Sequence, residues 1–125
     1  MGSASIESFG ELTPLCCIVT PVGMLGYGFS EDELNHGLEL SLKNGTPTAI
    51  ILDSGSTDSG PEKLALGYTT KPRSSYLRDL RKLVRAVCSH HVPLLIGSAG
   101  GDGSDAHVKE FADIIAQILN EDEFK

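Results

Sequence analysis

Three apolar runs, each followed by a loop rich in glycine and serine, constrain the fold of this chain most strongly. The runs are residues 15–19, 48–52 and 92–96, and the loops are residues 21–28, 53–61 and 97–104. Alternation of strand, loop and helix is the unit of an open parallel sheet, in which ligands bind outside the carboxyl ends of the strands. The sequence therefore predicts where a ligand binds more clearly than it predicts what happens there.

Amphipathic segments between and after these runs are predicted to be helices. The first begins at Ser30, whose spacing to Glu33 forms a capping box, and ends at Asn44-Gly45. The second covers about residues 74–90, and the third begins after Gly103. The expected order is β-α-β-α-β-α with right-handed crossovers. This order predicts a three-layer, Rossmann-like α/β domain with a parallel sheet.

A chain of 125 residues has the size of one domain. We expect a flexible leader over residues 1–14, a single α/β domain over residues 15–120, and a polar tail over residues 121–125 that frays. The net charge of −7 argues against nucleic-acid binding, and no apolar stretch approaches the roughly 18 residues of a membrane span.

Cysteine usage bears on cellular location and on metal binding. The three cysteines, Cys16, Cys17 and Cys88, are odd in number and lack the spacing of a metal site. They are interpreted as reduced core residues of a cytoplasmic protein, without a structural metal.

Two further segments depart from the ordinary pattern. About twenty residues, Ser54 to Arg73, join the second predicted strand to its helix, whereas such loops usually have about 2–6 residues. This connection is interpreted as a binding loop or a lid. In addition, six of the ten cations lie between Lys71 and Arg85. They form either a solvated face with i,i+4 ion pairs or a contact surface. The contact surface would bind an anionic ligand tail or an acidic partner, such as the stretch Glu31-Asp32-Glu33 of a second copy.

The catalytic candidates lie in or just after the loops that follow the second and third strands. Asp53 and Asp58 are proposed as acid/base groups or as carboxylates that bind hydroxyl groups. Asp102 or His107 is the candidate for a second proton-transfer group, because His107 follows the last glycine loop in the first turn of its helix.

Glycine loops supply the remaining candidate contacts. In the third loop, the hydroxyl of Ser98 and the backbone amides of Gly100 and Gly101 are expected to hold an oxyanion. The loops match neither G-x-G-x-x-G nor a Walker loop, so no nucleotide is indicated and the cofactor stays open. The ligand-binding candidates are Gly23, Gly26, Tyr27, Gly28, Ser54, Ser56, Thr57, Gly97, Gly100 and Gly101.

The segment Asp53-Ser54-Gly55-Ser56, after the apolar residues 50–52, also matches the motif of aspartic proteases. Retroviral-type proteases have about this length and dimerise to supply two aspartates. They are almost entirely β-structured, whereas two long amphipathic helices are predicted after this motif. The protease is kept as a second alternative function.

Three segments together resemble the acyclic terpene utilisation family. They are Thr20-Pro21-Val22-Gly23-Met24-Leu25-Gly26-Tyr27-Gly28-Phe29, Asp53-Ser54-Gly55-Ser56-Thr57-Asp58-Ser59-Gly60-Pro61 and Ile96-Gly97-Ser98-Ala99-Gly100-Gly101. The resemblance covers roughly residues 20–118. It implies a ligand-binding α/β domain that acts on small carboxylic or acyl metabolites, in a family of catabolic proteins. Family members are usually longer, so the chain corresponds to their N-terminal portion.

These observations favour a catabolic enzyme of unknown reaction type. Its site would be built from the three strand-end loops around a small-molecule ligand. The alternative is a non-catalytic subunit of a larger catabolic complex. In either case we expect a homo-oligomer or a partner subunit, because three parallel strands leave two open edges.

Overall fold

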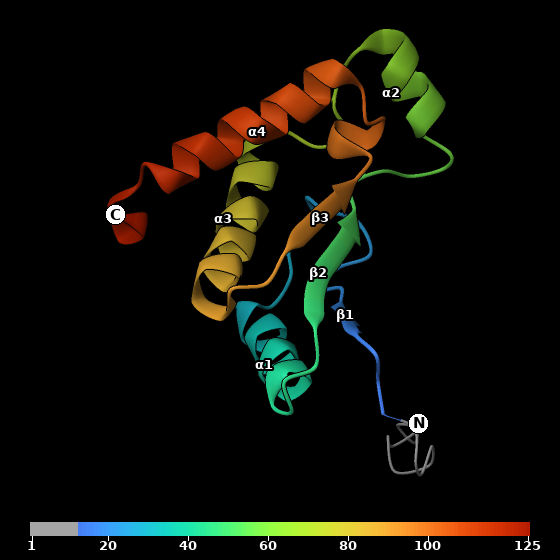
Figure 1. The fold of residues 1–125 in the computed structure, drawn as a ribbon. Coiled ribbons are helices and arrows are strands. Elements are labelled where there is room, and N and C mark those ends of the chain that lie inside the picture. Colours follow the sequence, from blue (N-terminus) through green and yellow to red (C-terminus); the bar gives the residue numbers. More distant parts are fainter. Residues whose placement is uncertain (1–12) are drawn as a thin grey trace.

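The computed structural model describes residues 13–125 and contains one parallel sheet of three strands (Figure 1). The strands are β1 (Cys17–Val19), β2 (Thr48–Asp53) and β3 (Leu94–Gly97), with β2 in the centre. The α/β class with a parallel sheet is therefore confirmed. Residues 1–12 of the expected leader lie outside the described residues.

Helices follow each strand, as the sequence predicts. They are α1 (Glu31–Leu42), α2 (Gly60–Leu66), α3 (Arg73–His90) and α4 (Asp105–Leu119), with 3₁₀ turns η2 (Ala99–Gly101) and η3 (Asp122–Phe124). Ser30 caps α1, because its Oγ accepts a hydrogen bond from the backbone N–H of Glu33 at 3.2 Å. Short α2 was not predicted: it lies in the connection interpreted as a loop and buries no side chain, so it has no apolar stripe to detect.

The core lies between the sheet and helices α1, α3 and α4. Alternate residues of β2, including Ile50 and Leu52, are buried against these helices. On α3, Tyr76 is fully buried, and its ring lies 4.8 Å from that of Phe111 on α4. Burial of these side chains on one face of the sheet supplies the main driving force for folding.

The opposite face of the sheet is open, which corrects the expected three-layer arrangement. Ile18 of β1 is 62% exposed and Leu95 of β3 is 52% exposed, and residues 13–125 place no helix over them. The physical reason is the strand order. The chain moves across the sheet in one direction, from β1 to β2 and then to β3. Two successive crossovers that have the same handedness and move in the same direction place their helices on the same face of the sheet.

The cysteines are not core residues, contrary to expectation. Cys16 and Cys88 are exposed, and Cys17 is partly buried; all three are free thiols. The open sheet face explains the difference at β1, since an apolar strand was assumed to be covered on both faces.

Cations of α3 pair with distant acids of the same chain rather than with i,i+4 neighbours. The Nη2 atom of Arg81 lies 2.7 Å from Oε1 of Glu121. Arg85 contacts both Glu31, at 3.1 Å, and Glu123, at 2.7 Å. The tail expected to fray therefore forms η3 and is tied to α3. The acidic stretch considered as an intermolecular partner already contacts α3 within the chain.

Candidate functional site

The three glycine loops meet at the carboxyl ends of the strands, as predicted. The backbone N–H of Leu25 donates to the carbonyl of Asp53, and the N–H of Ser54 donates to the carbonyl of Gly97, both at 2.9 Å. These bonds tie the first loop to the second and the second to the third. The parallel strand order explains the convergence, because all three strands end at one edge of the sheet.

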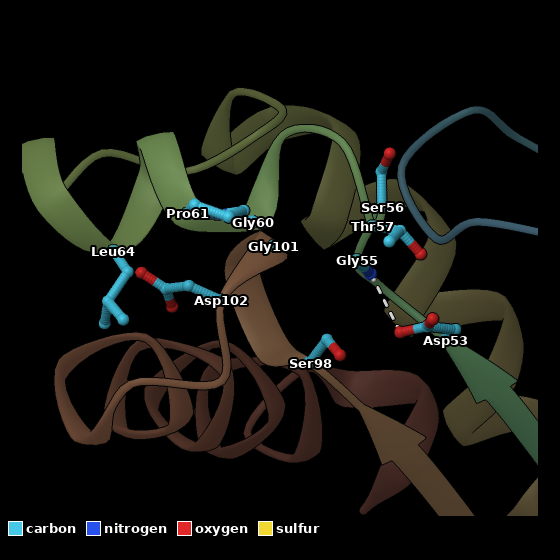
Figure 2. Close-up of a pocket in the computed structure, with 10 residues that line it drawn as sticks. All are labelled: Asp53, Gly55, Ser56, Thr57, Gly60, Pro61, Leu64, Ser98, Gly101 and Asp102. Atoms are coloured by element: carbon cyan, nitrogen blue, oxygen red, sulfur yellow. Dashed lines mark hydrogen bonds between the residues drawn. The ribbon is translucent and has the colours of Figure 1, made fainter.

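A cavity of about 390 Å³ lies between the second and third loops, with α2 as one wall (Figure 2). In Figure 2, Asp102 and Leu64 lie toward one end, Asp53 toward the other, and Ser98 between them. The lining residues are Asp53, Gly55, Ser56, Thr57, Gly60, Pro61, Leu64, Ser98, Gly101 and Asp102. The lining therefore carries two carboxylates and three hydroxyl groups but no cation.

The first loop supports the structure but does not line this cavity. The N–H groups of Gly26 and Gly28 donate to Oδ2 of Asp79, at 2.8 and 3.0 Å. Gly23 also lies outside the lining, and Tyr27 is 61% exposed with the Lys71 ammonium 3.6 Å from its ring centre. The predicted ligand contacts of the first loop are therefore not part of this cavity.

Asp79 is a residue that the sequence analysis missed. Its side chain is fully buried, and its Oδ1 accepts a hydrogen bond from Nε of Arg78 at 2.8 Å. A signal was present: Asp79 follows Tyr76 by three residues and precedes Leu83 by four, so it lies on the buried face of α3. A carboxylate on a buried face needs hydrogen-bond donors, and here the backbone N–H groups of the first glycine loop supply them.

The turn after β3 has an uncommon backbone conformation. Ser98 adopts φ +52°, in the left-handed region that non-glycine residues rarely visit, and its side chain lines the cavity. Gly55 packs against it, because a Cβ at residue 55 would lie 2.5 Å from the Cβ of Ser98. The N–H of Gly101 donates to the carbonyl of Ser98 at 2.8 Å. This bond corrects the oxyanion hypothesis, since the Gly101 amide is already engaged.

Asp102 and His107 form a buried pair at the start of α4. Nδ1 of His107 lies 2.7 Å from Oδ1 of Asp102, and the N–H of Ser104 donates to the same oxygen at 2.9 Å. The side chains of His107 and Asp102 are only 7% and 2% exposed. Burial raises the pKa of Asp102, but the hydrogen bonds from Ser104 and His107 outweigh it and hold the pKa below its usual value. Asp102 is thus a carboxylate at neutral pH, and it holds the imidazole of His107 in place.

Asp53 occupies the other end of the cavity and is exposed. Its Oδ1 accepts a hydrogen bond from the N–H of Gly55 at 2.9 Å, which leaves its second oxygen available to a ligand. Asp58 is exposed and does not line the cavity. Among the other predicted contacts, Ser56, Thr57 and Gly101 line it. Three do not: Ser54, Gly97 and Gly100.

Metal-ligand clusters and membrane-crossing helices are both absent from residues 13–125. No group of three or more His, Cys, Asp and Glu side chains is placed to bind a metal ion. No helix in the same range has both the length and the apolar character needed to cross a membrane.

Comparison with known proteins gives no identity. No family model, curated protein or solved structure matches the chain. The function proposed for it therefore rests on its own residues and on the resemblance described above.

The contribution of Asp102 to stability is expected to depend on pH. Its pKa is lowered on folding, so its contribution is present above the unfolded value of about 3.9 and is lost as pH falls through the folded pKa. Urea unfolding at pH 5 should show Asp102→Asn less stable than wild type by about 1–3 kcal/mol. The gap should narrow as the pH falls below the unfolded value of about 3.9, and a gap independent of pH would contradict this assignment.

Proposed function

We propose that the chain binds a small acyl metabolite in the cavity between the second and third loops and acts on it as a catabolic enzyme. The supporting observation is the buried Asp102–His107 pair: Asp102 lines the same cavity as Ser98, and His107 contacts Asp102 but does not line the cavity. A carboxylate that faces a cavity can accept a proton from a ligand, and a histidine paired with it stabilises the charge of the pair. This arrangement is one that acid/base chemistry requires.

The charges of the lining favour one form of acyl ligand. Asp53 and Asp102 both line the cavity, and none of the other lining residues is a cation. A free carboxylate would meet like charges there, which is unfavourable at short range. A neutral acyl group, such as an ester, amide or thioester, would instead accept hydrogen bonds at its carbonyl from Ser56, Thr57 or Ser98.

In the proposed mechanism each end of the cavity has a separate task. Asp53 accepts hydrogen bonds from hydroxyl or N–H groups of the ligand and fixes its orientation. Ser98 donates to the acyl oxygen, where negative charge develops when the carbonyl reacts. Asp102 accepts a proton from the ligand, and His107, which contacts Asp102 from outside the lining, is the positioning residue that holds its carboxylate. The reaction type and the cofactor stay open.

The test compares binding and turnover of defined probes. We expect methyl butyrate and butyramide to shift the NMR signals of Ser56 and Ser98, and butyrate to shift them much less. Asp53→Asn should weaken binding of butyramide, whose N–H groups can donate to Asp53, about tenfold, or about 1.4 kcal/mol, with Tm nearly unchanged, since Asn can still accept from Gly55. Asp58→Asn is the matched control, because it removes the same charge from the same loop outside the cavity.

Catalysis is tested separately from binding. We expect wild-type protein to consume at least one of a panel of short-chain acyl esters and thioesters, followed by NMR, and His107→Asn to lose that activity while it still binds the probe. Equal probe binding by Asp53→Asn and Asp58→Asn would reject the site. Binding without consumption of any probe would reject the enzyme and favour a binding module.

A non-catalytic interaction subunit is the second candidate. The observation that favours it is the open face of the sheet, where Ile18, Ala49, Ile51 and Pro93 line an apolar hollow. We also propose that the domain works as an assembly in the cytoplasm, where free thiols such as those of Cys16 and Cys88 persist. The aspartic protease is not pursued, because Asp53 lies on a parallel sheet among helices rather than in an all-β fold.

A further inference from the structure

Helix α4 carries an exposed apolar stripe beside the free edge of β3. The stripe consists of Val108, Ala112, Ile115 and Leu119, at successive spacings of four, three and four residues. Val108 is 52% exposed and Leu119 is 47% exposed. The residues that face the core, such as Phe111 and Ile114, lie on a neighbouring face of the helix. Spacing of four and three is that of a seam between two helices.

A groove runs between this stripe and β3. Its lining comes from β3, the start of η2 and α4: Leu94, Ile96, Ala99, Val108, Phe111, Ala112 and Ile115. Every one of these side chains is apolar. Lys109 and Asp113 of α4 do not line the groove, and they form an ion pair with each other at 2.7 Å. The groove therefore suits an apolar occupant without a charge of its own.

Backbone groups of β3 indicate that the occupant includes a strand. Ile50 donates to the carbonyl of Pro93, and Ser54 donates to that of Gly97. Because carbonyls alternate in direction along a strand, the N–H and C=O groups of Leu94 and Ile96 point away from β2, toward the free edge. Unpaired edge groups above an apolar groove form a template for another strand.

We propose that the occupant is the β3 edge and the α4 stripe of a second copy of this chain, related by a two-fold axis. With Leu95 on the axis, Leu94 of each copy pairs with Ile96 of the other as antiparallel neighbours that exchange both hydrogen bonds. The two α4 helices then run antiparallel, and Ala112, at the midpoint of α4, lies at the crossing. Its small side chain permits close approach of the two helices.

The size of this surface sets the expected affinity. A helix of 15 residues is about 22 Å long. The stripe and strand edge thus give a footprint on the order of 400 Å² per chain, at the small end of specific interfaces. We therefore expect dissociation constants on the order of 10 to 100 µM. The contact is self-complementary because both partners present the same apolar residues.

The experiment places charges at the proposed axis. Ala112 is exposed, so Ala112→Glu and Ala112→Lys should leave the circular dichroism spectrum and Tm near those of wild type. By sedimentation equilibrium up to about 500 µM, well above the expected dissociation constant, wild type should form a dimer and each variant should be a 13.3 kDa monomer. An equimolar mixture of the two variants should regain the dimer, because opposite charges then meet at the axis.

The matched control is the same pair of changes at Ala106, an exposed residue on the side of α4 opposite the stripe. These variants should dimerise as wild type does. A wild-type monomer at about 500 µM, single Ala112 variants that still dimerise, or a mixture that stays monomeric would each overturn the proposal. The outcome is independent of acyl binding, since the groove shares no residue with the cavity.

Discussion

Replacing Asp79 with alanine is expected to lower the free energy of unfolding by about 1–3 kcal/mol, the cost of leaving a buried hydrogen-bond donor unpaired. The carboxylate is fully buried and binds the N–H groups of Gly26 and Gly28 together with Nε of Arg78. Its removal leaves the buried Gly26 donor unpaired. Urea denaturation monitored by circular dichroism measures the change.

Asp79→Asn should lose less, because an amide oxygen can still accept from the first loop. The control is Asp113→Ala on α4, which removes an exposed carboxylate that contacts Lys109, and it should change stability by less than about 1 kcal/mol. If Asp79→Ala were as mild as this control, the buried carboxylate would not be what holds the first loop.

Gly100→Ala is expected to destabilise the protein by about 2–5 kcal/mol, since a left-handed conformation costs an alanine about 1–2 kcal/mol and overpacking adds about 1–3. Gly100 has φ +72°, and an added Cβ would lie 2.7 Å from both Cβ and Cγ of His107. The methyl group must therefore displace His107 or the turn itself. Thermal and urea unfolding would measure the loss, and NMR would report a shifted His107 ring.

Gly67→Ala separates the two contributions. Gly67 has φ +75°, nearly that of Gly100, but an added Cβ there would have no atom within 4 Å. It should show the cost of conformation alone, about 1 kcal/mol. Equal losses in the two variants would mean that His107 yields to the methyl group without cost.

Much of the fold follows from patterns that are local in the sequence. Apolar runs with glycine loops predict the parallel strands and the edge where the loops meet, and the Ser30 cap predicts the start of α1. The layer arrangement was not predictable this way, because the path of a crossover depends on strand order rather than on any local run. Short α2 was missed for a different reason. It has no buried face, so its sequence has no periodic pattern of apolar residues.

The candidate site was predictable in its residue types but not in its pairings. Asp53, Ser98 and Asp102 all line the cavity. The contact between His107 and Asp102 depends on the turn made by Gly100 and Gly101. The positive φ angles of these two glycines cannot be inferred from secondary-structure propensities. Asp79 was missed because its partners are backbone groups about fifty residues away.

Helix α2 contributes Pro61 and Leu64 to the wall of the cavity but buries no residue of its own. Its side chains can therefore change with little effect on the stability of the sheet and core helices. The polar end of the cavity, in contrast, is fixed by strand ends and by a glycine turn that tolerate few changes. In evolutionary terms, the residues required for folding are distinct from the α2 residues that can change to accommodate a different ligand.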